Sequence, residues 1–211
     1  MSLWVQGRFG SGISGFLFMS DDDFLKEDLR KTLRVVRNAI SSKQQSEASI
    51  NLLKQILKLP TYLKSKRIAA YLSSDGEIDL EPLIHQSWAM GKEVYLPVIK
   101  PGKSRELWFV LFTPETKLIQ NRFKIFEPDP HHNPKLPAHL LDMVFTPLVG
   151  FDSNANRLGM GGGFYDTTFA FKKEKPKSKP LLIGVAHECQ RVEKIDAEEW
   201  DVGLDLVVTD I

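Results

Sequence analysis

Apolar segments of β-forming residues alternate with amphipathic segments along most of this 211-residue chain. The β-type segments are residues 67–73, 93–99, 106–112, 142–151, 181–188 and 204–210. Helical periodicity covers residues 24–40, 46–58, 79–90 and about 165–172. Because alternating strands and helices usually form a parallel or mixed sheet with helices on both faces, the sequence predicts one three-layer α/β/α domain around a mostly parallel mixed sheet. Ligands in such sheets bind beyond the C-terminal ends of the strands.

The charge balance and the cysteine content exclude several classes of protein. Lys and Arg number 28 against 27 Asp and Glu, a net charge of +1, so binding to nucleic acid by bulk charge is not expected. Cys189 is the single cysteine, which excludes an internal disulfide and a cysteine-built zinc site. It fits a reducing compartment, and we expect a cytoplasmic protein. No apolar run approaches the roughly 18 residues of a membrane span.

The first 23 residues differ in composition from the rest of the chain. They are rich in Gly and Ser, and their apolar run at residues 13–19 is short and interrupted. This pattern does not predict a signal peptide. We expect residues 1–23 to be a flexible leader without chemistry and residues 24–211 to be a single catalytic domain.

Basic side chains recur along the first predicted helix at helical spacing. Lys26, Arg30, Arg34 and Arg37 are separated by four, four and three residues, which places them on one face. Two interpretations are open. The face is either a solvated basic surface, the commoner case, or a surface that meets phosphates.

The most informative stretch is PLVGFDSNANRLGMGGGFYD, residues 147–166. Four of its glycines fall within residues 159–163, between a predicted strand and a predicted helix. Glycine backbone approaches a ligand closely, and successive N–H groups can form an anion nest. Arg157 adds a forked cation, and Asp166 a carboxylate of the kind that binds Mg²⁺. The pattern fits neither the dinucleotide fingerprint nor the P-loop, so it predicts an anion loop of another type or, alternatively, a mobile glycine turn.

The segment RLGMGGGFYD resembles the signature of the 5-formyltetrahydrofolate cyclo-ligase family, also called 5,10-methenyltetrahydrofolate synthetases. Further blocks match in order: the first helix with Lys26, Leu29, Arg30 and Arg37; AAYLSSDGEID with Glu77; GKEVYLPVI; Glu127–Pro128; and the C-terminal DVGLDLVVT. The resemblance covers residues 26–210. It implies the three-layer architecture shared with sugar isomerases and CoA transferases.

The resemblance also implies an activity. Family members use Mg²⁺ and ATP to convert 5-formyltetrahydrofolate into 5,10-methenyltetrahydrofolate, ADP and phosphate. The formyl oxygen attacks the γ-phosphate, an N5 iminium phosphate forms, and N10 closes the ring as phosphate leaves. Such chemistry depends mainly on positioning and charge stabilisation. The implied partner is 5-formyltetrahydrofolate, including its polyglutamated forms, with no nucleic acid and no membrane, and we expect a monomer.

The resemblance assigns roles residue by residue. The catalytic residues would be Arg157, Tyr165 and Lys26. ATP would be bound by Lys26, Arg30, Arg157, Leu158, Gly159, Met160, Gly161, Gly162, Gly163, Phe164 and Tyr165. The folate would be bound by Leu72, Glu77, Met160, Gly161, Gly162, Gly163 and Phe164. Asp166 and Asp205 would hold Mg²⁺.

Three positions depart from the usual family pattern. Ala155 stands where glycine is usual, Phe164 replaces a tyrosine, and Gly162 stands where many members have lysine. If residue 155 needs a positive φ, alanine costs of order 1 kcal/mol there. Two other functions stay open: a non-catalytic relative that binds a folate, a nucleotide or RNA, and an enzyme of similar architecture acting on sugar phosphates or CoA esters.

Overall fold

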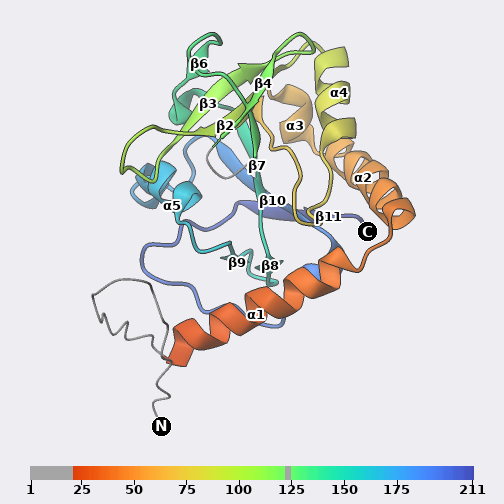
Figure 1. The fold of residues 1–211 in the computed structure, drawn as a ribbon, viewed down its shortest axis with the longest axis vertical. Coiled ribbons are helices and arrows are strands. Elements are labelled where there is room, and N and C mark those ends of the chain that lie inside the picture. Colours follow the sequence, from red (N-terminus) through yellow and green to blue (C-terminus); the bar gives the residue numbers. More distant parts are fainter. Residues whose placement is uncertain (1–20, 122–124) are drawn as a thin grey trace, which may run out of the picture.

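The computed structural model describes residues 21–121 and 125–211. Seven strands form the main sheet in the order β11-β10-β7-β1-β2-β3-β6 (Figure 1). Their bounds are β1 Arg67–Ala69, β2 Glu93–Ile99, β3 Leu107–Phe112, β6 Lys135–Leu136, β7 Met143–Pro147, β10 Leu181–Ala186 and β11 Leu206–Thr209. The pairs from β11 across to β2 are parallel, whereas β3 and β6 are antiparallel additions. The mostly parallel mixed sheet is confirmed.

Central strands of this sheet are buried on both faces. In β7, Val144 and Phe145 are both fully buried, and successive side chains of a strand point to opposite faces. Phe145 accordingly belongs to one core cluster and Val144 to the other. This burial explains why the strands read as continuous apolar runs rather than as an alternating pattern.

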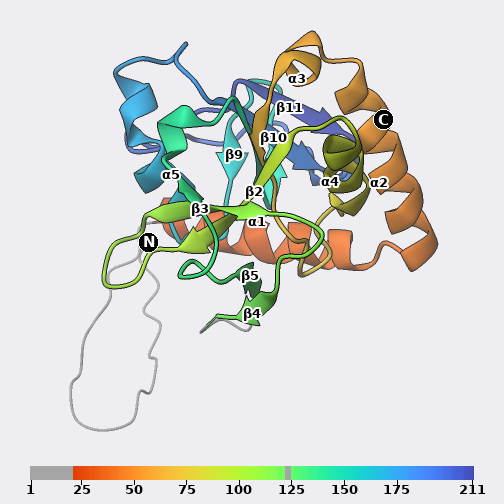
Figure 2. The same ribbon diagram turned by 90° about the horizontal axis from the view of Figure 1, so that it is seen from above.

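Helices cover the two faces unequally (Figures 1 and 2). One face carries α2 Ser42–Leu57, α3 Pro60–Lys64 and α4 Glu81–Ala89. The opposite face carries the short α5 Phe164–Thr168 and a 3-10 helix at Ala170–Lys173, whose segment packs Phe169 into the core. Among the described residues, no helix has both the length and the hydropathy needed to cross a membrane.

Two small ribbons accompany the main sheet. Strands β4 Leu118–Gln120 and β5 Phe126–Pro128 pair antiparallel, and so do β8 Gly150–Phe151 and β9 Arg157–Leu158. The predicted strand over 142–151 is therefore two strands, because the chain turns after Pro147. The predicted strand over 67–73 is shorter than expected, since only Arg67–Ala69 pair with neighbours. The helix expected at about 165–172 is broken into α5 and the 3-10 helix.

The first helix, α1 Asp21–Asn38, begins earlier and faces differently than predicted. Residues 21–23, which the sequence analysis placed in the expected leader, belong to the helix, and residues 1–20 lie outside the described part of the chain. The apolar spacing within residues 24–40 predicts that Leu33 and Val36 both face the core; Leu33 is buried, but Val36 is 41% exposed while Arg37 is only 1% exposed. The apolar spacing alone does not predict this orientation of α1, because the basic side chain of Arg37 forms part of the buried face.

Candidate active site

The glycine-rich loop leaves the β8–β9 ribbon and enters α5. The ribbon turns through Ala155, whose φ is +61°, so an alanine occupies a left-handed position there. The Asp152 carboxylate accepts the N–H groups of Asn154 and Asn156 and thereby fixes this turn. Gly161 and Gly163 have φ values of +84° and +67°, conformations that L side chains rarely adopt. The loop shape thus depends on glycine at these two positions.

Open space borders the backbone of this loop. A Cβ added at Gly159 would meet no heavy atom within 4 Å. A Cβ at Gly161 would meet only the guanidinium of Arg30, at 3.9 Å. A ligand can therefore approach the main chain at both positions, as an anion-binding loop requires.

Two cations of α1 are directed toward the site. Arg30 donates its Nε–H to the carbonyl of Gly159 at 2.8 Å. Lys26 donates to Glu198 Oε1 at 2.6 Å, and its side chain is only 17% exposed. The interpretation of this face as a solvated surface is wrong, since its members make contacts with distant segments.

Arg157 and Asp166 are paired with each other. Arg157 Nη2 donates to Asp166 Oδ1, and Nη1 donates to the carbonyl of Val202. The N–H of Val202 donates to the same Asp166 oxygen at 3.0 Å, which closes a small network. The second oxygen, Oδ2, has no hydrogen bond from the described residues.

Asp205 occupies a different environment from Asp166. It precedes β11, and its Oδ2 accepts the N–H of Leu182 at 2.7 Å. The buried ammonium of Lys172 lies 3.2 Å from the same oxygen. Over residues 21–121 and 125–211, no three His, Cys, Asp or Glu side chains form a group that could hold a metal. The donor chemistry still suits Mg²⁺, which is commonly held by one or two carboxylates together with waters and substrate phosphates.

Glu77 and Tyr165 lie within electrostatic range of one another. Burial raises the pKa of Glu77, although the Ser74 N–H donates to its Oε2 at 3.0 Å. Burial also raises the pKa of Tyr165, the Glu77 charge raises it further, and the Arg157 charge opposes the rise. Tyr165 is therefore a neutral phenol that feels the charges of both Glu77 and Arg157, and its ring is stacked on Phe169 with the ring centroids 6.3 Å apart.

The remaining predicted residues vary in exposure. Met160 is 57% exposed, whereas Leu158 is buried in the small cluster beneath α1. Leu72 is half-buried against the main core. Phe164 and Gly162 line a cavity of about 390 Å³ on the side of the loop that faces residues 102–105.

The sequence did not indicate the structural importance of Arg37, nor that a second loop faces the glycine loop across the site. The sequence places Arg37 on a basic helix face that is either solvated or meets phosphates, yet Arg37 is buried and donates to the carbonyl and carboxylate of Asp75 and to the carbonyl of Leu148. The second loop is the one between β2 and β3, where Gly102 and Arg105 face the glycine loop. Its only sequence signal is the basic, glycine-containing segment KPGKSRE at residues 100–106.

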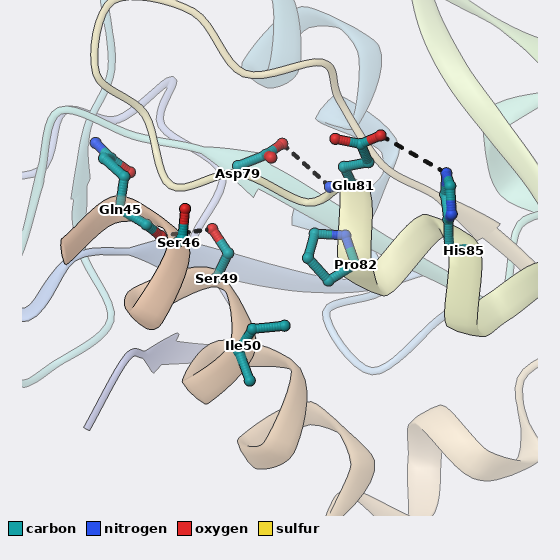
Figure 3. Close-up of a pocket in the computed structure, with 8 residues that line it drawn as sticks. All are labelled: Gln45, Ser46, Ser49, Ile50, Asp79, Glu81, Pro82 and His85. Atoms are coloured by element: carbon teal, nitrogen blue, oxygen red, sulfur yellow. Dashed lines mark hydrogen bonds and ion pairs between the residues drawn. The ribbon is translucent and has the colours of Figure 1, made fainter. Parts of the chain in front are cut away.

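A separate cavity of about 380 Å³ lies between α2 and α4 (Figure 3). It is lined by Gln45, Ser46, Ser49, Ile50, Asp79, Glu81, Pro82 and His85. Its acidic groups have protein partners: Asp79 accepts the Glu81 N–H, and Glu81 lies 3.8 Å from His85. No residue of the predicted site lines it, so we place the candidate site at the glycine loop.

Comparisons with known proteins agree on one family. The model of the 5-formyltetrahydrofolate cyclo-ligase family matches residues 23–210. The 5-formyltetrahydrofolate cyclo-ligase of Escherichia coli (strain K12) is 43% identical over 84% of this chain and 96% of its own length. The enzyme of the same name from Haemophilus influenzae is 40% identical over 85% of this chain and 94% of its own length.

Solved structures give the same picture of the fold. The 5,10-methenyltetrahydrofolate synthetase of Aquifex aeolicus superimposes with a TM-score of 0.74 and 30% identity, over 88% of this chain and 90% of the other. The family match extends over nearly all of the described residues and includes α1, the Glu77 loop and the glycine loop. This chain belongs to the 5-formyltetrahydrofolate cyclo-ligase family.

Proposed function

We propose that the protein cyclises 5-formyltetrahydrofolate to 5,10-methenyltetrahydrofolate, with consumption of ATP and release of ADP and phosphate. The observation that carries the proposal is the setting of the glycine loop: Arg30 binds the Gly159 carbonyl, the Arg157–Asp166 ion pair joins the two ends of the loop, and open space borders Gly159. Cations and main-chain N–H groups around one loop suit a polyphosphate. The relatives at 40–43% identity bear the name of this reaction.

The nucleotide side of the site would be formed by α1 and the loop. Arg30 is held against Gly159, and Lys26 lies on the same helix face one turn away. A bound triphosphate would replace Glu198 as the ion-pair partner of Lys26. Asp166 and Asp205 would hold Mg²⁺, which neutralises charge on the phosphates when bound. Asp166 Oδ2 and Asp205 Oδ1, which accept no hydrogen bond from the described residues, are the atoms available for it.

The folate side would be formed by Glu77, Leu72 and Tyr165. A carboxylate at Glu77 accepts N–H groups of the kind found on a pterin edge. The phenol of Tyr165 stays protonated because burial and Glu77 both raise its pKa. It can therefore donate a hydrogen bond to negative charge that develops on the formyl oxygen as the N5 iminium phosphate forms.

We propose that the protein acts as a monomer in the cytoplasm. The free thiol of Cys189 suits a reducing compartment. Burial raises the pKa of this thiol, which disfavours a nucleophilic role. The near-balanced charge favours a small-molecule substrate over nucleic acid.

The test is the absorbance of methenyltetrahydrofolate after protein, ATP, Mg²⁺ and 5-formyltetrahydrofolate are mixed. We expect product only when ATP and Mg²⁺ are both present, and a loss of at least about 100-fold in Arg157→Ala and Asp166→Ala. Asp196→Ala is the matched control, because Asp196 is 77% exposed and pairs with Lys194 on the surface. A folded wild type that binds ATP but forms no product would overturn the proposed reaction and point to a different substrate.

A further inference from the structure

The loop between β2 and β3 carries two cations that have no acidic partner in the part of the chain that the structure describes. Its one acidic residue, Glu106, is already paired with Lys100 at 2.5 Å. Lys103 and Arg105 form no ion pair or hydrogen bond with any residue in the described ranges. Both side chains are exposed. The loop therefore presents two unneutralised positive charges.

These charges face the glycine loop across a cavity. The cavity has a volume of about 390 Å³ and is lined by residues 102–105 from one side and by Gly161, Gly162 and Phe164 from the other. Arg105 Nη1 lies 3.7 Å from the position that a Cβ would occupy at Gly163. In Figure 1 the β2–β3 loop reaches toward α5, while α1 runs along the other side of the β8–β9 ribbon.

Arg105 differs from the other cations of the site because it has no hydrogen-bond or ion-pair partner within residues 21–121 and 125–211. Arg30 is bonded to the Gly159 carbonyl, Arg157 to Asp166 and Lys26 to Glu198. A guanidinium that has no protein acceptor and borders a cavity is suited to a ligand carboxylate or phosphate. Arg105 is therefore available to a ligand without the loss of an existing contact.

We propose that Arg105, supported by Lys103, binds the carboxylates of the glutamate tail of the folate substrate and so sets the preference for tail length. This inference rests on the proposed function. Arg30 approaches the loop at Gly159 and Gly161, the end toward α1, where the nucleotide is placed. Arg105 approaches at Gly163, two residues before Tyr165, whose phenol we place at the formyl group of the folate.

The exposure of the two cations favours a tail over a buried phosphate. A glutamate tail extends away from the reacting pterin and carries one α-carboxylate per glutamate, so its far end reaches solvent. An exposed pair of cations on a loop can bind such carboxylates without a desolvation penalty as large as that in a buried site. Each additional glutamate would bring a further carboxylate near Lys103.

Steady-state kinetics with mono- and triglutamyl 5-formyltetrahydrofolate test the proposal. Arg105→Ala is expected to raise the KM for the monoglutamate about fivefold and that for the triglutamate more, with kcat and the KM for ATP unchanged. Arg105→Lys should recover part of the loss. Added salt should raise the folate KM of the wild type more than that of Arg105→Ala, because screening weakens exposed charge pairs. Arg191→Ala is the control, since Arg191 is an exposed arginine paired with Glu188.

Two results would overturn the proposal. An unchanged folate KM in Arg105→Ala excludes tail binding, and a selective rise in the KM for ATP assigns Arg105 to the phosphates instead. Failure of the proposed reaction is distinguishable, because the wild type would then form no product. In that case, equilibrium dialysis of mono- and triglutamyl folate without ATP still decides the matter: equal affinities for wild type and Arg105→Ala contradict the proposal.

Discussion

Arg157 in β9 and Asp166 in α5 are ion-paired across the two ends of the glycine loop. From the sequence, Arg157 is expected to bind phosphate and Asp166 is expected to bind Mg²⁺. Their pairing means that each neutralises the other when no ligand is bound. Any ligand that uses both must supply a negative group to Arg157 and a positive one to Asp166, and a magnesium-bound polyphosphate supplies both together.

Arg37→Ala is expected to destabilise the protein by about 3 kcal/mol, because Asp75 and two backbone carbonyls would lose a buried donor. Arg37→Lys should not restore the stability, since a single ammonium cannot replace the fork of a guanidinium. Urea unfolding measures both. The matched control is Arg34→Ala, which removes a 41% exposed partner of the same Asp75 and should cost less than about 1 kcal/mol. Equal losses in the two variants would contradict this account.

Gly161→Ala and Gly159→Ala separate backbone strain from ligand access. Alanine at Gly161 is expected to cost about 1 kcal/mol of stability because φ is +84° there. Alanine at Gly159 meets open space and has no such strain, so its stability should change little. Its Cβ would nevertheless stand where a ligand approaches, and we expect weaker ATP binding by calorimetry with an unchanged Tm. Normal ATP affinity in Gly159→Ala would place the nucleotide elsewhere.

Asp142 gives a predicted acid dependence of stability. Burial alone would raise its pKa, but hydrogen bonds from Lys179 and from the N–H groups of Arg67 and Lys66 outweigh burial and lower the pKa from 3.8 to about 2. The folded pKa is depressed, so the stabilisation is complete above about pH 4 and is lost as the pH falls toward 2. It amounts to about 2 kcal/mol at about 1.4 kcal/mol per pKa unit.

Asp142→Asn should therefore unfold at lower urea concentration than the wild type at neutral pH, and the difference should shrink in acid. Asp196→Asn serves as the exposed control, with no difference at either pH. A gap between wild type and Asp142→Asn that stays constant from about pH 5 to about pH 2.5 would refute the assignment.

Glu77 gives a predicted pH dependence of folate affinity. Burial raises its pKa, so it takes up a proton at a higher pH than an ordinary glutamate. As the pH falls toward that raised value, the carboxylate is lost and the KM for the folate should rise, while the KM for ATP should not. Glu77→Gln should raise the folate KM by about tenfold and remove the pH dependence. Persistence of the same pH profile in Glu77→Gln would assign the titration to another group.

The sheet was largely predictable because its strands are buried on both faces. In a domain of this size, continuous apolar runs such as those containing Val144 and Ile183 form few structures other than a buried strand. Register and strand ends were less accessible to sequence reasoning. The runs of apolar residues continue past Ala69 and Pro147, where pairing stops. The residue at which a strand stops pairing depends on its partner strand, and the sequence of one segment does not identify that partner.

The site was predictable where it consists of a contiguous motif and not where it depends on tertiary contacts. The glycine loop and its neighbour Arg157 follow one another in sequence. The burial of Arg37 and the approach of Arg105 arise from segments 38 and 58 residues away, at Asp75 and Gly163. The resemblance raised a positive φ at Ala155 only as a condition, and alanine by itself does not indicate a left-handed turn.

The buried guanidinium of Arg37 joins three parts of the chain: α1, the segment that leads to Glu77, and the segment that leads to the glycine loop. The same buried side chain therefore contacts the segments that lead to both candidate substrate sites. We expect a ligand that orders the glycine loop to restrain the Asp75 turn as well through this side chain, which would reduce the entropy lost when the second ligand binds. The two substrates are then expected to bind with positive cooperativity, and by thermodynamic reciprocity each would raise the affinity for the other by the same factor.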